Sequence, residues 1–586
     1  MKTWLWIFPL LLAAAVAGAD ETFPDTGWRD RPNPLADPGA QVGGEIAVYL
    51  GQYPRSLNYY LDGSTQSAQV FGALYESLLD MDPVSAEYRP GLAERWTISA
   101  DKRTFTFQID PAARWSDGRA VTAQDVRFTY DTIMDPKHLT GAHKVAMERF
   151  EVPVVVDERT IRFRARSVHW QNLGAAGGMS ILPRHVLQGR DFNKVNFEFP
   201  VVSGPYRLGT LTEGIAITLE RRPDWWLRGA QRTRGTGNFQ TIRFRFYAEN
   251  ENAFEAFKKG LIDLYPVYTA RQWVSETSGP RFFNNWIVRQ QVFNHNPVGF
   301  QGFAMNMRRP PFDDLRVRRA MSLLLDREKL NQTMMYSQYF LHRSYYEDLY
   351  SLKSPCPNPL TPFDKHKARE LLEQAGWLVD PATGWRVKDG RRFVFKFLTR
   401  SAGTDKFLAV YAEDLKDAGI ELVIDQKDWA AWMKDMDGFN FDMTWAAWGA
   451  GIFKDPEGMW SSKEAERLGG SNITGFRNPA VDDLIALQKE IFDVHKRNEI
   501  VRKIDQIVFN DYPFVLLWNI NYTRLLYWNK FGMPATVLSK FGGEESAYWY
   551  WWLDPDAVAV LKDARANNLA VPPQPAVVVF DDVFTP

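Results

Sequence analysis

The pattern of apolar and polar positions predicts short strands and helices along the first half of the chain. Residues 45–50 and 103–109 alternate with the period of a half-buried strand, and residues 154–156 and 160–164 flank a polar turn, as in a hairpin. Residues 68–79 and 253–261 carry apolar side chains at helical spacing. Gly260 ends the second of these helices, before a strand predicted at 262–265.

The second half of the chain alternates helices and strands. Helices are predicted at 316–325, 365–375 and 405–418, and strands at 393–399 and 421–425. Gly376 stands just past a helix, where a left-handed cap is expected. This alternation predicts a mixed α/β lobe, and because 586 residues are too many for one core, we expect at least two lobes. The Pro- and Val-rich end of residues 557–586 is expected to be loosely held.

The N-terminus has the order of a secretory signal. Lys2 precedes an apolar run at 4–16, and small residues lead to Ala19, after which we expect cleavage. The alternative is an uncleaved interfacial anchor. No later apolar run is long enough to span a bilayer, so we expect an exported, soluble protein of the periplasm.

Composition narrows the classes of partner. A net charge of -1 argues against nucleic acid, which requires a basic face. The 22 Trp, 22 Tyr and 39 Phe residues must supply core, and their surplus suits a cleft that holds varied ligands by apolar contact. Cys356 is the only cysteine, which excludes an internal disulfide, and no neighbouring base would make it a nucleophile.

Motifs of catalysis are missing from the sequence. HExxH, GxSxG and phosphate-loop patterns do not occur, and His138 and His143 lie in a polar stretch typical of solvated loops rather than zinc ligands. The glycine-rich residues 174–178 lack the frame of a dinucleotide site and are assigned to a hinge or loop. We therefore predict no enzymatic activity, no cofactor and no metal. A periplasmic hydrolase that uses distant carboxylates or an unseen metal stays open as the alternative class.

A series of motifs occurs in the order of one known family. They are LAERW (92–96), TFTF (104–107), WSDG (115–118), VTAQDV (121–126), SGPY (203–206), PPFDDLRVRRA (310–320) and TGFRNPAVD (474–482). This series resembles solute-binding protein family 5, the extracytoplasmic peptide receptors of ABC importers, and NHNPVGFQGF (294–303) is similar to its YejA branch. The motifs themselves are typical of scaffold: a turn at 115–118, a helix start capped by Thr122 with Asp125, and acids at 313–314 before a helix.

The resemblance implies an α/β fold of the bilobal periplasmic-binding-protein kind (type II, the large peptide-receptor class with an extra subdomain), with mixed sheets flanked by helices and a hinge. It places a first lobe at 20–300 with a subdomain inserted at about 70–200, a second lobe at 301–525, and a return to the first lobe at 526–586. It implies a monomer that captures oligopeptides, or modified peptides such as microcin C or cell-wall peptides, and delivers them to ABC permease subunits of the inner membrane. A sugar, an opine or a nickel chelate is the alternative cargo.

Receptors of this kind hold the peptide as an extra strand, bonded through its backbone. The segments that match the strand-forming walls are Ala447-Trp448-Gly449 and Ser64-Thr65-Gln66. Small residues beside Trp448 would let a ligand backbone approach closely; a buried strand next to Trp445 is the alternative.

The aspartate that typically anchors the peptide's amino terminus is missing here. Gly451, or the neighbouring Ile452, occupies its place, and Asp455 is the first acid that follows. Either Asp455 or another acid such as Asp428 anchors the amine, or the amine is not recognised, which would suit a modified or branched peptide.

Further candidates lie where the family's chain recrosses the cleft. Asn519 and Tyr522 offer polar groups there, and Arg524 offers a fork for a ligand carboxylate, with a salt bridge inside the scaffold as the alternative. Trp429 and Trp432 are candidates for a pocket wall or for core.

Overall fold

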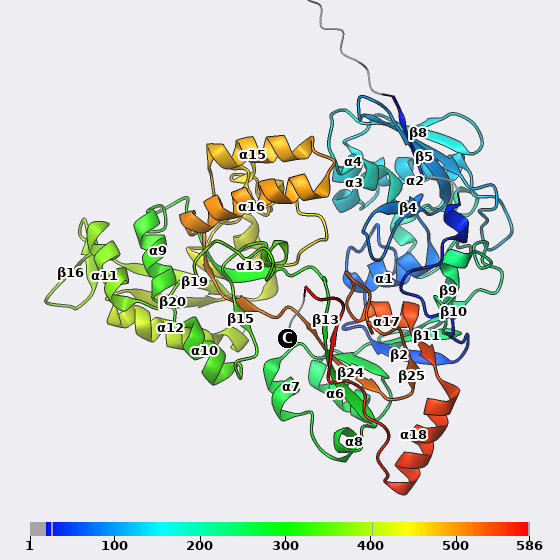
Figure 1. The fold of residues 1–586 in the computed structure, drawn as a ribbon. Helices are drawn as coiled ribbons and strands as arrows, with labels where there is room; N and C mark the ends of the chain where they lie inside the picture. Colours follow the sequence, from blue (N-terminus) through cyan, green and yellow to red (C-terminus); the bar gives the residue numbers. More distant parts are fainter. Residues whose placement is uncertain (1–18, 25–26, 401, 584–586) are drawn as a thin grey trace, which may run out of the picture.

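The computed structural model describes residues 19–24, 27–400 and 402–583 and places them in two lobes (Figure 1). The first lobe contains an eight-stranded mixed sheet and a five-stranded antiparallel sheet, and the second lobe contains a five-stranded mixed sheet. The predicted signal peptide lies outside the described residues, except for Ala19. The described part of the chain has no helix with the length and apolarity that a membrane crossing requires.

The eight-stranded sheet of the first lobe is buried on both faces. On β24, Leu525 and Tyr527 face one hydrophobic core while Leu526 and Trp528 face another, as the two-residue period of a strand requires. Helices α6 (Asn250–Lys258) and α7 (Ala270–Ser275) belong to the second of these faces. The strand order is β27 (Val577–Val579), β13 (Ile287–Phe293), β24 (Thr523–Trp528), β12 (Leu264–Pro266), β2 (Glu45–Tyr49), β11 (Thr241–Arg245), β10 (Ala216–Arg221) and β9 (Tyr206–Thr212).

The five-stranded antiparallel sheet forms a subdomain of the first lobe. Its order is β1 (Glu21–Phe23), β5 (Ala93–Ile98), β6 (Thr104–Ile109), β8 (Thr160–Arg164) and β7 (Val154–Val155), and β7 and β8 form the predicted hairpin. The alternation on β6 buries Phe105 and Phe107, as predicted. The cap of α2 (Ala123–Met134) is also confirmed, because Thr122 and Asp125 form a capping box. The subdomain further holds α3 (Gly141–Met147), α4 (Asn172–Gly177) and α5 (Arg184–Leu187).

The second lobe is a sheet covered by helices on both faces, which confirms the predicted mixed α/β lobe. The order is β20 (Glu421–Gln426), β19 (Val394–Thr399), β21 (Met443–Trp448), β14 (Phe300–Met305) and β22 (Phe514–Leu516). Phe303 and Phe397 face one core, and Phe300 and Leu398 face the other. The helices are α9 (Leu315–Leu323), α10 (Arg327–Met334), α11 (Lys365–Gln374), α12 (Asp405–Asp417), α13 (Trp429–Asp437), α14 (Glu457–Trp460), α15 (Pro479–Lys489) and α16 (Val494–Asp511).

The chain crosses between the two lobes twice, at residues 294–299 and 520–522. The two crossings are tied together, since the Asn519 side-chain amide donates to the carbonyl of Gly299 at 2.8 Å. In Figure 1 the second lobe extends to one side of the first, and α15 and α16 reach back toward the subdomain. The sequence limits assigned above to the lobes remain predictions.

Three local predictions were wrong. The helix predicted at 68–79 is α1 (Thr65–Leu74), because the backbone beyond it bonds elsewhere: the N–H of Glu76 donates to the Ser203 hydroxyl at 2.9 Å. The glycine-rich residues 174–178 form α4 and its cap rather than a loop, where Cβ atoms on Gly174 and Gly177 would clash with Tyr88 and Leu79. The C-terminal stretch is not loose in its described part, up to residue 583, because β27 extends the large sheet beside β13.

Candidate functional site

The predicted wall Ala447-Trp448-Gly449 forms the end of β21 and its exit. β14 pairs with all six residues of β21, whereas β19 pairs only with Met443 and Thr444. Within the described residues, the other four residues of β21 therefore have no ladder partner on the β19 side. Ala447 and Gly449 are exposed, and a Cβ placed on Gly449 would meet no atom within 4 Å. An open strand edge with space beside it is the geometry that accepts an added strand.

The first crossing of the hinge supports this wall directly. A Cβ on Gly299 would lie 1.9 Å from the carbonyl oxygen of Trp448 and 3.0 Å from the Cα of Gly449. Only glycine permits backbones to approach this closely. Because Asn519 bonds to the Gly299 carbonyl, the structure brings Asn519 together with Trp448 and Gly449, as part of the hinge behind the wall.

The predicted segment Ser64-Thr65-Gln66 is not a strand, which corrects that part of the prediction. Ser64 is the N-cap of α1, and its hydroxyl accepts from the N–H of Ser67 at 3.3 Å. Thr65 and Gln66 form the first turn of the helix, and Thr65 is exposed. A cap residue bonds its own helix first, which explains why the segment leaves the extended conformation.

Trp429 lies at the surface rather than in the core. It opens α13, its side chain is 57% exposed, and its ring stacks on Trp432 at a centroid distance of 5.4 Å. The Arg400 guanidinium lies 4.5 Å above the Trp429 ring. Asp428, the alternative amine anchor, caps α13 by accepting from the Ala431 N–H at 2.9 Å.

A buried lysine holds the loop in which the anchoring aspartate is missing. Lys454 is 5% exposed, and its ammonium donates to the Gly451 carbonyl at 2.7 Å and pairs with Asp348. Burial raises the pKa of Asp348, while Lys454 opposes that rise. The chain therefore places a neutralised ion pair, not a free carboxylate, behind Gly451.

Asp455 is bonded within the protein. Its carboxylate accepts from the side-chain amide of Gln171 in the subdomain at 2.9 Å and from the Glu457 N–H at 3.1 Å. Burial raises the pKa of Asp455. These contacts make Asp455 a link between the two lobes, a role that sequence reasoning did not predict.

Further contacts join the lobes around that link. The Trp170 indole donates to the Gln488 side chain at 2.9 Å, its backbone N–H donates to the Lys489 carbonyl at 2.9 Å, and Arg497 lies 4.1 Å above its ring. Trp170 and Gln488 are 318 residues apart, and neither belongs to a motif, so the sequence carries no signal for this interface.

His169 lies at the same interface. A ring nitrogen of His169 and one carboxylate oxygen each of Asp455 and Glu457 all lie within 4.8 Å of one another, a spacing that suits a metal ion. The three groups are otherwise engaged: the His169 Nδ1 accepts from the Gln171 N–H at 3.1 Å, and Glu457 pairs with Lys489 at 2.5 Å. Burial, with Arg149 and Lys489, lowers the pKa of His169 to about 4, so the ring is neutral at pH 7. Since Nδ1 accepts a hydrogen bond, the proton resides on Nε2, and this ring offers a donor rather than a ligand atom.

Tyr522 and Arg524 lie at the hinge. The Tyr522 ring packs on Phe293 at 4.9 Å, and Arg524, which is 1% exposed, lies 5.1 Å from the ring of Tyr339. Within the described residues Arg524 has no carboxylate partner, so the salt bridge proposed for it is not formed. The structure thus separates the predicted residues into a wall with its hinge, a helix start, an aromatic surface pair and an interlobe link.

Gln171→Ala is expected to shift the ligand-free protein toward a more open form, because Gln171 and Asp455 belong to different lobes. One such hydrogen bond contributes about 1 kcal/mol, roughly a fivefold change in a two-state population. Small-angle X-ray scattering should report a larger radius of gyration, with exposed Gln188→Ala as the control. An unchanged radius would show that this bond does not hold the lobes together.

Comparison with known proteins shows which families share this architecture. Residues 87–468 match the profile of the bacterial extracellular solute-binding proteins, family 5 Middle. A probable peptide-binding protein YejA from Agrobacterium fabrum is 27% identical over 81% of this chain and 84% of its own length. The oligopeptide-binding protein AppA of Bacillus subtilis in complex with a nonapeptide superposes with a TM-score of 0.68 at 21% identity, over 88% of this chain and 99% of AppA.

The same fold serves other cargo. NikZ from Campylobacter jejuni in complex with Ni(L-His) superposes with a TM-score of 0.68 at 17% identity, over 87% of this chain and 99% of NikZ. These superpositions confirm the predicted fold, the α/β architecture of periplasmic binding proteins with mixed sheets flanked by helices. With a profile match over more than half of its length and YejA among its relatives, the chain belongs to the bacterial extracellular solute-binding proteins of family 5, in the YejA-like branch.

Proposed function

We propose that this protein captures an oligopeptide, plain or modified, as an additional strand beside β21. The observation that carries the proposal is the open edge of β21: four of its six residues, among them exposed Ala447, lack a ladder partner on the β19 side within the described residues, and exposed Gly449 follows the strand. Backbone bonds to such an edge hold a peptide without reading its sequence. Trp429 and Arg400 offer an aromatic and cationic surface for side chains.

The charged groups near the wall bear on how the amino terminus of a peptide would be held. Asp455 is bonded to Gln171, Asp428 caps a helix, and Lys454 lies behind Gly451. Asp455 is bonded inside the protein and the place of the missing aspartate is backed by an ion pair, which favours a ligand held mainly by its backbone. Asp428 uses one carboxylate oxygen in its cap and stays the alternative anchor. Microcin C and cell-wall peptides are the kinds of modified peptide that such a site would admit.

Export and delivery complete the proposal. The family consists of solute-binding, non-catalytic proteins of ABC transporters, and we propose that this chain acts as a monomer in the periplasm and hands its cargo to inner-membrane permease subunits. Ligand contacts to both lobes would shift the protein toward the closed form that the permease recognises.

Native mass spectrometry of the purified protein, before and after incubation with a peptide mixture, tests this function. Intact peptides retained by the protein support it. Steady cleavage of the mixture would favour a hydrolase, and retention of a sugar, an opine or a nickel chelate with no peptide would assign another cargo.

Gly449→Ala is expected to weaken peptide binding at least roughly tenfold, because a methyl group would occupy the space that a ligand backbone needs. The melting temperature should not change, since the added Cβ meets no protein atom within 4 Å. Calorimetric titration measures the affinity, and Gly458→Ala, where the added Cβ also meets no atom within 4 Å, is the control. Equal peptide affinity of the variant and the wild type would show that the peptide does not bind at this edge.

A further inference from the structure

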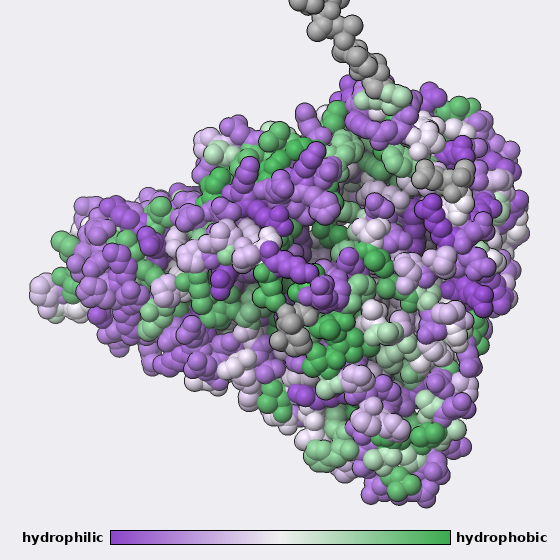
Figure 2. Space-filling model, viewed as in Figure 1, coloured by the Kyte–Doolittle hydropathy of each residue, from purple (hydrophilic) through white to green (hydrophobic). Residues whose placement is uncertain are grey.

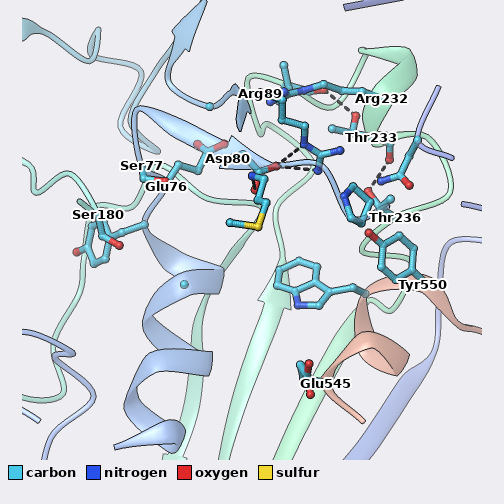
Figure 3. Close-up of a pocket in the computed structure, with 18 of the residues that line it drawn as sticks. Glu76, Ser77, Asp80, Arg89, Ser180, Arg232, Thr233, Thr236, Glu545 and Tyr550 are labelled. Carbon is cyan, nitrogen blue, oxygen red and sulfur yellow. Dashed lines mark hydrogen bonds and ion pairs between the residues drawn. The ribbon is translucent and has the colours of Figure 1, made fainter. Parts of the chain in front are cut away.

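A cavity of about 500 Å³, separate from the edge of β21, lies wholly within the first lobe. Its walls are α1, the hairpin of β3 (Leu79–Met81) and β4 (Tyr88–Pro90), residues 225–236 and α17 (Glu545–Tyr550), as Figure 3 shows. None of its lining residues comes from the second lobe, so closure of the lobes does not form it. Its volume is that of a site for a small molecule.

Two carboxyl groups in this cavity have no ion-pair partner within the described residues. Asp80 is neutralised by Arg89 at 2.7 Å, whereas Glu76 accepts from the Trp226 indole at 2.8 Å and Glu545 accepts from the Gly543 N–H at 2.7 Å. Arg232 and Arg222 lie close enough to Glu76 to lower its pKa but form no ion pair with it. Glu76 lies at the end of α1 and Glu545 at the start of α17, on opposite sides of the cavity (Figure 3). Burial raises the pKa of Glu76 to about 7 and also raises the pKa of Glu545.

Two residues of the lining also carry a buried polar atom that has no partner in the described part of the chain. The Oε1 atom of Gln69 is a hydrogen-bond acceptor with no partner, and Arg232, which is 9% exposed, has no partner for its Nε. The lining carries three acids and two arginines, which leaves an excess of negative charge once Glu76 and Glu545 are ionised.

Aromatic rings complete the lining. They are Tyr75, Trp225, Tyr548, Trp549 and Tyr550. Faces of such rings attract cations, and carboxylates beside them add charge-assisted hydrogen bonds. The combination of carboxyl groups without ion-pair partners and aromatic walls is the chemistry that recognises an alkylammonium group.

We propose that this cavity is a second ligand site, separate from the edge of β21, which binds a small organic cation through Glu76 and Glu545. The cation is either a free amine or the terminal ammonium of a short peptide.

Calorimetric titration of the full-length protein near pH 8, at which Glu76 is ionised, tests the site. The probes are 1,5-diaminopentane, 1-pentanol as its uncharged control, triglycine and acetylated triglycine. The diamine should bind and pentanol should not. Triglycine binding that acetylation abolishes would assign the peptide terminus as the source, and diamine binding without triglycine binding would assign free amines.

Two kinds of variant locate the binding. Glu76→Gln and Glu545→Gln should each weaken diamine binding at least roughly tenfold, while exposed Glu213→Gln should not. Gly72→Leu places a side chain in the cavity from a position where a Cβ meets no atom within 4 Å, and it should abolish binding without lowering the melting temperature.

The outcomes separate this site from the peptide site. Gly449→Ala should leave diamine binding unchanged, and Gly72→Leu should leave binding of a longer, acetylated peptide unchanged. If the wild type binds neither the diamine nor triglycine, or if the binding survives both Gly72→Leu and the two glutamine substitutions, the proposal is overturned and peptide capture between the lobes is unaffected.

Discussion

Gly299→Ala is expected to weaken peptide binding by at least roughly tenfold and to lower the free energy of unfolding by about 1–3 kcal/mol. The added Cβ would lie 1.9 Å from the Trp448 carbonyl oxygen, so the two backbones must separate. Trp448 and Gly449 would then move from the position in which the open edge of β21 meets a ligand. Chemical denaturation and calorimetric titration measure the two effects.

The control for this prediction is Gly449→Ala, which adds the same methyl group where it meets no protein atom within 4 Å. Loss of affinity in both variants, with loss of stability only in Gly299→Ala, would show that the hinge positions the wall and that the ligand contacts it. Full affinity and full stability in Gly299→Ala would show that the hinge and the wall are mechanically independent.

This pair of residues gives the hinge a part in ligand binding beyond flexibility. Gly299 belongs to the first crossing, and Asn519, which immediately precedes the second crossing, bonds to its carbonyl. A rotation of the lobes about these crossings must therefore displace Trp448 and Gly449. Ligand occupancy and lobe closure would then be coupled through backbone contact rather than through a distant network.

Local structure was predictable where it depends on residues that are close together in the sequence. The alternation on β6, the capping box of α2 and the left-handed Gly376 each depend on residues a few positions apart, and each was confirmed. The helix at 68–79 failed at its end because Ser203, distant in sequence, takes the backbone N–H of Glu76. Local patterns cannot report such a partner.

The site was less predictable than the fold for the same reason. The family resemblance predicts a strand at Ala447-Trp448-Gly449, yet the open edge follows from how β19 and β21 are paired. Asp455 carries no mark of its bond to Gln171, which lies 284 residues earlier. Arg524 looked like a ligand fork, but its position on β24 buries it beneath Tyr339.

A buried carboxylate of α16 holds the segment that supports the loop after β21. Asp505 is fully buried and accepts hydrogen bonds from Ser344 and Tyr345 at 2.8 Å, from Tyr350 at 2.9 Å and from Asn358 at 3.2 Å. It thereby fixes residues 344–358. That segment carries Asp348, the partner of the lysine that holds the Gly451 carbonyl.

Asp505→Ala is expected to lower the free energy of unfolding by about 3–5 kcal/mol near pH 5, because four buried donors lose their acceptor. Burial raises the pKa of Asp505 to about 6, above its value in an unfolded chain. The folded state thus favours the protonated acid, so the contribution of Asp505 is full below about pH 4 and falls as the pH rises through 6. The cost of the substitution should therefore be larger near pH 5 than near pH 7.5, measured by urea denaturation at both values. Asp483→Ala, which removes an exposed acid of α15, should cost little at either pH; a cost for Asp505→Ala that grows with pH would show that its carboxylate is stabilised, not strained, by its four donors.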